Sequence, residues 1–434
     1  RVLWVLNIMP PVIAQALNRE YSVKEGWISG ILQSICSGGE DVEPGLCFPV
    51  GKEEAELSTT VQVGKRKLPC YGFYEPTERP EVYEEYDLIQ RLKEIIRSFE
   101  PDILHIFGTE YGHCLAAVKA YARPVRTLIG IQGVISACAK EYMADLPREV
   151  QRQSTLRDWL KQDSIRQQQE KFAIRGEREK IAVACCGHVT GRTEFDRQQV
   201  LAMNPKALYH PMNETLREVF YEGHWEWEKC RRHSIFVSQA DYPLKGFHYL
   251  LQAANRLVHE FPDLRITVAG NSLVKYESLK DKLKISGYGR YLRRLLRETG
   301  MEGRVEFTGK LSAEEMKEQY LKCHTYVCAS ALENSPNSVG EAMLLGVPVV
   351  ASRTGGIPDM VTHGKEGLLF PKGNIRALTE AIADVWESEE LCTRLSRSAV
   401  ERARMTHDGE TNFGRLMEIY EEMMKSGSRE DRVP

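Results

Sequence analysis

Two glutamates, Glu333 and Glu341, lie eight positions apart in the segment ENSPNSVGEAMLLG. Between them, Pro336 is suited to the first turn of a helix that Ser335 or Ser338 can cap. The exposed N–H groups of a helix start can bind a phosphate, and a carboxylate suits a pair of neighbouring sugar hydroxyls. The segment therefore predicts a nucleotide-sugar site. The ribose would lie on one glutamate, the diphosphate on the helix start and the transferred sugar beside the other glutamate.

A purely structural role for Glu341 is the alternative. The spacing Ser338-x-x-Glu341 matches a capping box, in which the glutamate only satisfies the start of its own helix. Taken alone, this spacing favours neither role. The residues that follow favour a ligand site, because the predicted buried strand VPVVAS leads into Gly355 and Gly356. Two adjacent glycines there indicate a close approach of the backbone to a ligand.

A lysine in a second loop, Lys245, is the next candidate. It lies in the segment SQADYPLKGF, which begins at the end of the predicted strand 234–239 and continues into the loop after it. A cation at this place can stabilise the charge that grows on a leaving diphosphate. A lone lysine in a loop is usually only solvated, but this one follows a strand of the same predicted sheet as Glu333. The shared sheet edge favours a functional role for Lys245.

The chain around these residues alternates short β-branched runs with helical patterns, which is typical of parallel βα units with helices on both faces of a sheet. Such sheets bind ligands at the carboxyl ends of their strands. The first half shows the same alternation, and a boundary is expected near residues 211–213. The predicted fold class is α/β, with two Rossmann-like domains that face each other across a cleft. The predicted strands of the second half are 234–239, 264–270, 305–309, 325–330 and 347–352.

The region from Glu333 onward resembles a known signature. Glu333 and Glu341 are followed by AMLLGVPVVASRTGGIPDMV and GLLFP. This pattern is similar to the E-x7-E donor-binding signature of the retaining glycosyltransferases of family 4, which have the two-Rossmann-domain (GT-B) fold. The resemblance is specific over about 40 residues and diluted elsewhere. It implies that Glu333 lies against the donor sugar, that Glu341 binds the ribose, and that Asn337 and Ser338 offer backbone amides to the diphosphate.

The resemblance also implies a domain division. Residues 1–213 are expected to form the acceptor-binding domain, and residues 214–411 the donor-binding domain. The final segment THDGETNFGRLMEIYEEMM resembles the C-terminal helix of the family. Residues from about 412 to 434 are therefore expected to cross back to the N-terminal domain.

The loop with Lys245 matches the Lys-Gly pair of the family, but the arginine that usually precedes it is replaced by Gln239 or a neighbour. Gln239 can supply only a neutral hydrogen bond. In the N-terminal half, Gly26 corresponds to the first of two adjacent glycines of the family. Gln132 occupies the position at which many members have a histidine that faces the transferred sugar. The predicted catalytic residues are Glu333, Lys245 and Gln132, and the predicted donor-binding residues are Glu341, Asn337, Ser338, Gln239, Gly246, Gly26 and Pro336.

Four further residues of the first half are weaker candidates. His105 and His113 lie near a predicted strand end, although histidines in such places are more often core or surface residues. Glu110 and Arg192 lie on strand-end loops from which they could reach an acceptor.

The composition excludes some partners. The net charge of −3 and the pI near 6.5 show no cationic excess for binding nucleic acid. No Asp-x-Asp motif or His/Cys cluster predicts a metal, so neither a metal nor another cofactor is expected. Eleven cysteines without a C-x-x-C pair favour a reducing, cytoplasmic location. Peripheral contact with the inner face of the membrane is a further hypothesis, because basic residues in 148–180 alternate with Trp159, Leu160 and Phe172.

The predicted function is that of a retaining glycosyltransferase. It would move a hexose from a nucleotide-diphosphate sugar, expected to be a UDP-sugar, to a glycan or lipid-linked acceptor in cell-surface polysaccharide or glycolipid biosynthesis. The first alternative is a non-catalytic scaffold that binds nucleotide sugars, since the family arginine and histidine are absent. The second is a nucleotide-sugar epimerase of related fold, against which the E-x7-E and Lys-Gly patterns argue. The sequence does not identify the sugar, because donor choice depends on a few pocket contacts.

Overall fold

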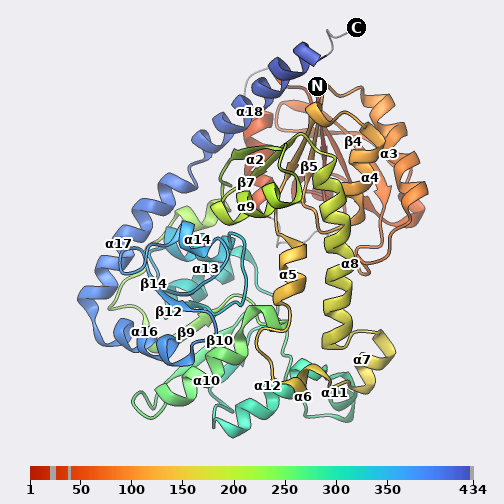
Figure 1. Ribbon diagram of the computed structural model, residues 1–434. Coiled ribbons are helices and arrows are strands. Elements are labelled where there is room, and N and C mark those ends of the chain that lie inside the picture. Colours follow the sequence, from red (N-terminus) through yellow and green to blue (C-terminus); the bar gives the residue numbers. More distant parts are fainter. Residues whose placement is uncertain (20–25, 38–40, 431–434) are drawn as a thin grey trace. The chain divides into compact units, whose positions relative to one another are not determined.

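A computed structural model describes residues 1–19, 26–37 and 41–430 of the chain (Figure 1). The chain divides into two compact units. The first unit contains residues 1–137, 171–217 and 407–434, and the second contains residues 138–170 and 218–406. Each unit is built on its own largely parallel sheet with helices, so the prediction of two Rossmann-like domains is confirmed. That the domains face each other across a cleft stays a prediction.

The sheet of the first unit has the strand order β3-β4-β2-β1-β5-β6-β7-β8 in the described residues. Its neighbouring strands are parallel except for β3 and β4, which form an antiparallel edge hairpin. The strands are β1 (Val2–Val5), β2 (Pro44–Val50), β3 (Ser58–Val63), β4 (Arg66–Tyr74), β5 (Ile103–Phe107), β6 (Thr127–Gly130), β7 (His188–Gly191) and β8 (Leu208–Pro211). The helices of this half of the chain are α1 (Pro11–Ala16), α2 (Gly26–Ser37), α3 (Glu85–Phe99), α4 (Gly112–Tyr121), α5 (Ile135–Glu141), α8 (Ile165–Ala184) and α9 (Glu194–Met203), with 3-10 turns η1 (Lys52–Glu54) and η2 (Pro124–Arg126).

The sheet of the second unit is wholly parallel, with the order β11-β10-β9-β12-β13-β14. The five strands predicted for this half overlap β9 to β13. The strands are β9 (Arg231–Val237), β10 (Arg265–Val268), β11 (Val305–Phe307), β12 (Cys323–Cys328), β13 (Val349–Arg353) and β14 (Leu368–Pro371). The helices are α6 (Arg148–Gln151), α7 (Leu156–Lys161), α10 (Phe247–Leu257), α11 (Leu279–Lys284), α12 (Gly287–Glu298), α13 (Ala313–Lys322), α14 (Asn337–Leu344), α15 (Ile357–Met360), α16 (Ile375–Glu387) and α17 (Glu389–Thr406), with 3-10 turns η3 (Glu218–Tyr221) and η4 (Pro243–Lys245).

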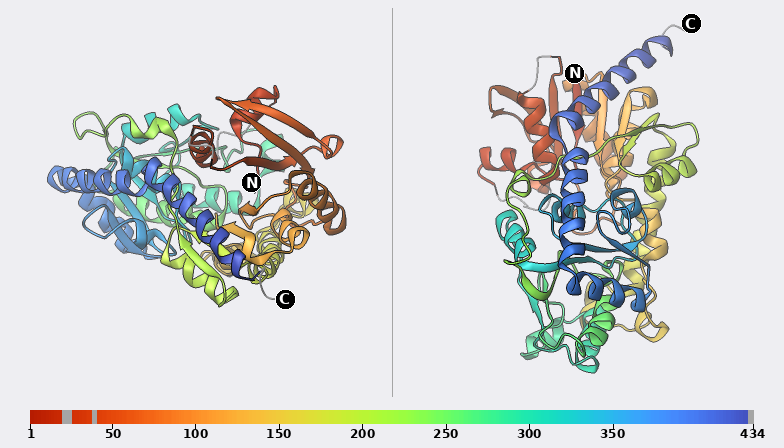
Figure 2. Two further views of the ribbon diagram at one scale, coloured as in Figure 1. Left: turned by 90° about the horizontal axis from the view of Figure 1, so that it is seen from above. Right: turned by 90° about the vertical axis from the view of Figure 1, so that its left-hand side faces the viewer.

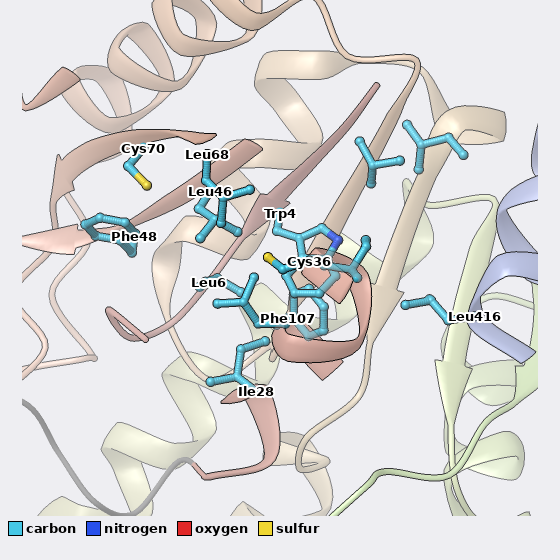
Figure 3. Packing of buried hydrophobic residues seen from close by; sticks show 14 of the residues in the cluster. Trp4, Leu6, Ile28, Cys36, Leu46, Phe48, Leu68, Cys70, Phe107 and Leu416 are labelled. Atoms are coloured by element: carbon cyan, nitrogen blue, oxygen red, sulfur yellow. The ribbon is translucent and has the colours of Figure 1, made fainter. Parts of the chain in front are cut away.

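The core of the first unit is centred on Trp4 of β1, whose ring meets Phe107 of β5 edge-on at 5.1 Å (Figure 3). The last helix, α18 (Gly409–Glu430), contributes Leu416 and Tyr420 to the same core. The indole N–H of Trp4 donates to the Tyr420 hydroxyl at 2.9 Å. Because its apolar face completes this core, α18 belongs to the first unit, and it lies beside the N-terminal strands (Figure 2).

The structure divides the chain differently from the expected boundary at 213/214. The change of unit comes at 217/218, and residues 138–170 cluster with the second unit rather than the first. Side-chain contacts explain the second difference. The Tyr249 hydroxyl donates to the Asp145 carboxylate at 2.6 Å, and His248 Nε2 lies 2.8 Å from the Ala144 carbonyl oxygen. These contacts join residues far apart in sequence, which is why the sequence pattern gave no sign of them.

None of the helices in the described part of the chain combines the length and the low charge that a bilayer-spanning helix requires.

Candidate functional site

The candidate donor residues gather at one edge of the second sheet. Strands β9, β12 and β13 are neighbours and run parallel, so the loops after them meet at their carboxyl ends. These loops carry Lys245, Glu333 and Gly355, respectively. The structure therefore brings together residues from three segments that are far apart in the sequence.

Lys245 and Glu333 form an ion pair, with 2.7 Å between Lys245 Nζ and Glu333 Oε1. The same carboxylate oxygen accepts a hydrogen bond from the Ser330 hydroxyl at 2.7 Å. The Lys245 and Glu333 side chains are only 18% and 14% exposed. Burial lowers the pKa of Lys245, but the charge of Glu333 outweighs this effect and holds the pKa well above its usual value. Lys245 is thus a fixed cation at the sheet edge.

Two glycines set the backbone around this pair. Gly246 has a φ of +64°, and a Cβ there would overlap the carbonyl oxygen of Ala329. Gly355 has a φ of +51°, and a Cβ there would overlap the carbonyl oxygen of Glu333, which also accepts a 3.0 Å hydrogen bond from the Gly356 N–H. Both positions need glycine because the loops approach each other closely. The close approach predicted for Gly355 is therefore made to the backbone of Glu333.

Helix α14 begins beside the ion pair. Pro336 is its N-cap and supplies no side-chain acceptor for the first N–H groups, which suits the helix start to an anionic oxygen. The capping box suggested by Ser338 is not formed: Ser338 lies inside the helix, and its hydroxyl accepts a 2.8 Å hydrogen bond from Tyr326. Asn337 is the first helical residue, as the proposed diphosphate contact requires.

Glu341 lies one turn into α14 and is 5% exposed. The Tyr320 hydroxyl lies 3.4 Å from Glu341 Oε2 and 3.0 Å from the Ser338 carbonyl oxygen. Tyr326 is bonded in turn to Ser238 at 2.8 Å. The helix start is thus held by tyrosines of α13 and β12, which sequence reasoning did not select because they resemble ordinary core aromatics.

Gln239 follows β9 at the same edge, where its amide nitrogen donates to Asp241 at 3.0 Å. A neutral amide bonded to a carboxylate therefore lies where the resemblance would place an arginine, and Lys245 is the cation paired with Glu333.

The remaining predicted residues belong to the first unit. Gly26 is the first residue of α2, directly after residues 20–25, which lie outside the described part of the chain. Gln132 follows β6, and its amide nitrogen donates to Glu214 at 2.9 Å. Glu214 also pairs with Arg192 at 3.1 Å. Sequence reasoning missed Glu214, although it follows β8 at the same sheet edge.

The side chains of Gln132, Glu214 and Arg192 line an open pocket in the first unit. Its other walls come from the strand ends and α2, and include His105 and Thr190. The imidazole nitrogen Nε2 of His105 and the hydroxyl of Thr190 are buried and have no hydrogen-bond partner among the described residues. The pocket thus combines apolar walls with a few polar groups, as small-molecule sites commonly do.

The tautomer of His105 follows from its neighbours. The Tyr420 hydroxyl accepts from Trp4 and lies 2.7 Å from His105 Nδ1, so it can donate its own proton to this nitrogen. We therefore assign Nδ1 as the acceptor and place the ring proton on Nε2, at the wall of the pocket. Burial lowers the pKa of His105 to about 3, so the ring is neutral at physiological pH.

The other weak candidates, His113 and Glu110, are not among the residues that line this pocket. His113 Nδ1 lies 2.9 Å from Glu75; burial lowers the pKa of His113, but the charge of Glu75 outweighs it and raises the pKa. Burial raises the pKa of Glu110, whose Oε2 has no partner among the described residues. No group of three or more His, Cys, Asp or Glu side chains in the described ranges is arranged to hold a metal ion.

The second unit contains a segment that matches known proteins. Residues 225–402, which contain Lys245, Glu333 and Glu341, match the family model for glycosyl transferases, group 1. A D-inositol 3-phosphate glycosyltransferase of Corynebacterium urealyticum is 28% identical over 183 residues, which is 41% of this chain and 40% of that protein. The putative colanic acid biosynthesis glycosyltransferase WcaL of Escherichia coli K12 is 27% identical over 172 residues, 38% of either chain. The matched segment thus spans about two-fifths of the length of these curated relatives.

Solved structures match over the whole chain. The sucrose-phosphate synthase of Thermosynechococcus elongatus has a TM-score of 0.71 at 13% identity, with 98% of this chain and 100% of that chain covered. HepE of Anabaena, solved with UDP-glucose, has a TM-score of 0.65 at 15% identity, with 97% and 99% covered. At such identities the likeness shows the fold, which is that of the GT-B glycosyltransferases.

Proposed function

We propose that this chain is a retaining glycosyltransferase that transfers a hexose from a nucleoside-diphosphate sugar to a hydroxyl of a glycan or lipid-linked acceptor. A UDP-sugar is the donor that we favour. The group 1 glycosyl transferase match over residues 225–402 and the GT-B fold support the transferase activity. HepE, a structural neighbour solved with UDP-glucose, supports the choice of nucleotide.

The observation that carries the proposal is the Lys245–Glu333 pair at the start of α14. Lys245 Nζ and the first N–H groups of α14 would hold the diphosphate, and Glu341 would bind the ribose hydroxyls. Glu333 would accept hydrogen bonds from the hydroxyls of the transferred sugar. Each group then performs one recognition task, and all are fixed by the same sheet edge.

In the reaction, the acceptor oxygen bonds to the anomeric carbon while the bond from that carbon to the phosphate oxygen breaks. Attack from the face that the diphosphate leaves preserves the anomeric configuration. The leaving phosphate oxygen takes the acceptor proton, so no protein base is required. Lys245 stabilises the negative charge that develops on the diphosphate, a contribution that is largest in the transition state.

The pocket of the first unit is the proposed acceptor site. The neutral His105 would donate its Nε2–H to an acceptor oxygen, and Gln132 would orient the hydroxyl that attacks. Because Arg192 is already paired with Glu214, the pocket suits a neutral sugar hydroxyl better than a phosphate. A role in cell-surface polysaccharide or glycolipid synthesis is supported by the relative named for colanic acid biosynthesis. A cytoplasmic location is supported by eleven free cysteines.

The test is release of nucleoside diphosphate from a panel of UDP-, GDP- and ADP-sugars, with and without acceptor extracts. Transfer, or slow hydrolysis of one donor, supports the proposal. Donor binding without either reaction would support a non-catalytic scaffold, for which the neutral Gln239 and Gln132 argue. Interconversion of the sugar on the intact nucleotide would support an epimerase. NMR of the product's anomeric proton decides between retention and inversion.

A further inference from the structure

Two short helices of the second unit, α7 and α11, expose an unusual amount of apolar surface. On α7, Leu156, Trp159 and Leu160 are 55%, 65% and 66% exposed. On α11, Leu279 and Leu283 are 79% and 58% exposed, and their spacing of four places them on one helical face. Large exposed apolar groups that cluster in this way mark an interaction surface rather than ordinary surface variation.

The two helices lie next to each other although more than 110 residues separate them (Figure 1). The N-terminal cap of α7 holds the two helices together. Thr155 is the N-cap of α7 and forms a capping box with Asp158. The Asp158 carboxylate also accepts a 2.8 Å hydrogen bond from the N–H of Gly287, three residues after the end of α11. The exposed apolar side chains of α7 and α11 therefore lie on two neighbouring helices, and buried hydrogen bonds hold these helices together.

The segment that contains α11 carries an excess of positive charge. Residues 275–294 contain seven lysines or arginines and two acidic residues, whereas the whole chain has a net charge of −3. Lys161 of α7 and Lys282 and Lys284 of α11 are exposed beside the apolar residues. Apolar side chains within a basic rim are the pattern of a peripheral membrane-binding surface.

We propose that α7 and α11 bind the surface of an anionic lipid bilayer. The leucines and Trp159 would enter the interface between headgroups and acyl chains, and the lysines would contact anionic headgroups. The charge excess favours lipid over a second copy of this chain, because two copies would bring like charges together. Phe172 of the sequence hypothesis lies on α8 beneath Arg175 and is not one of the residues of α7 and α11. The inference goes beyond sugar transfer and does not depend on it.

The experiment is co-sedimentation of the full chain with vesicles of phosphatidylcholine alone or with about one-third phosphatidylglycerol. We expect binding to the anionic vesicles only, and weaker binding as salt rises. The variant L279S/L283S should bind at least roughly tenfold more weakly, and K282Q/K284Q should lose about fivefold per lysine. All of these residues are exposed, so the variants should keep the thermal stability of the native chain.

The matched control is L208S, which removes a leucine that is 55% exposed on β8 of the first unit and should not change vesicle binding. Absence of binding by the native chain would overturn the proposal, as would unchanged binding by L279S/L283S. Equal binding to neutral vesicles would also overturn it, because lysine contacts would then be irrelevant. Concentration-dependent dimerisation that L279S/L283S abolishes would assign the surface to a protein contact instead. Sugar transfer is not measured, so these outcomes are independent of the proposed activity.

Discussion

Replacing Lys245 by methionine tests two roles of this residue: its ion pair with Glu333, which affects folding stability, and its stabilisation of charge on the leaving diphosphate. At 2.7 Å and an effective dielectric constant of about 20, the charges attract by about 6 kcal/mol. Desolvation of the two largely buried groups offsets most of this attraction in the intact pair, but K245M leaves the Glu333 carboxylate buried without its cation, so it should lower the free energy of unfolding by about 3–5 kcal/mol. The loss of charge stabilisation on the diphosphate should lower kcat by about 10²- to 10³-fold. Urea unfolding and diphosphate release measure the two effects.

The double variant K245M/E333Q distinguishes these roles. It also removes the Glu333 carboxylate that K245M leaves unpaired, so part of the lost free energy of unfolding should be recovered. The kcat should stay low because the cation is still missing. The matched control is K322M, which breaks an exposed pair with Glu318 and should change stability by less than about 1 kcal/mol and leave kcat unchanged. A K245M enzyme with native kcat would refute the assignment of Lys245 to the leaving group.

Three further outcomes are expected. E341Q should weaken UDP binding in calorimetry by about ten- to a hundredfold, since a charge-assisted hydrogen bond to the ribose is lost; unchanged affinity would remove Glu341 from the site. G355A should destabilise the chain more than the control G364A in urea unfolding, because both positions have positive φ but only a Cβ at Gly355 would overlap backbone; equal losses would show that φ strain alone matters. The pKa of His105 is lowered to about 3 from an unfolded value near 6.5, so neutral His105 contributes stability above pH 6.5 that is lost as the pH falls towards 3. Between pH 6.5 and pH 5, the free energy of unfolding should therefore fall by about 2 kcal/mol less in H105N than in the native chain. An identical fall in both chains would contradict the burial of a neutral ring.

Local patterns predicted five of the six strands of the second sheet, β9 to β13, but not β14. Strands buried on both faces appear as short apolar runs, and their carboxyl ends predicted the common edge that carries Lys245 and Glu333. The structure adds two contacts that residue spacing cannot predict. Lys245 and Glu333 form an ion pair, and Gly355 packs closely against the backbone of Glu333.

The first unit was harder to predict because its site depends on partners distant in sequence. Gln132 was selected by resemblance, but its partner Glu214 comes from a strand end 82 positions away. His105 was a weaker candidate, because histidines in such places are more often core or surface residues. Its tautomer depends on Tyr420, 315 positions away, and no local pattern reports such a contact.

The most direct measurement is a crystal structure of the chain with UDP or an unreactive UDP-sugar. The account predicts that the diphosphate lies at the start of α14 within hydrogen-bond distance of Lys245 Nζ, and that the ribose hydroxyls contact Glu341. A nucleotide bound elsewhere, or one whose ribose and diphosphate touch neither residue, would contradict the central claim.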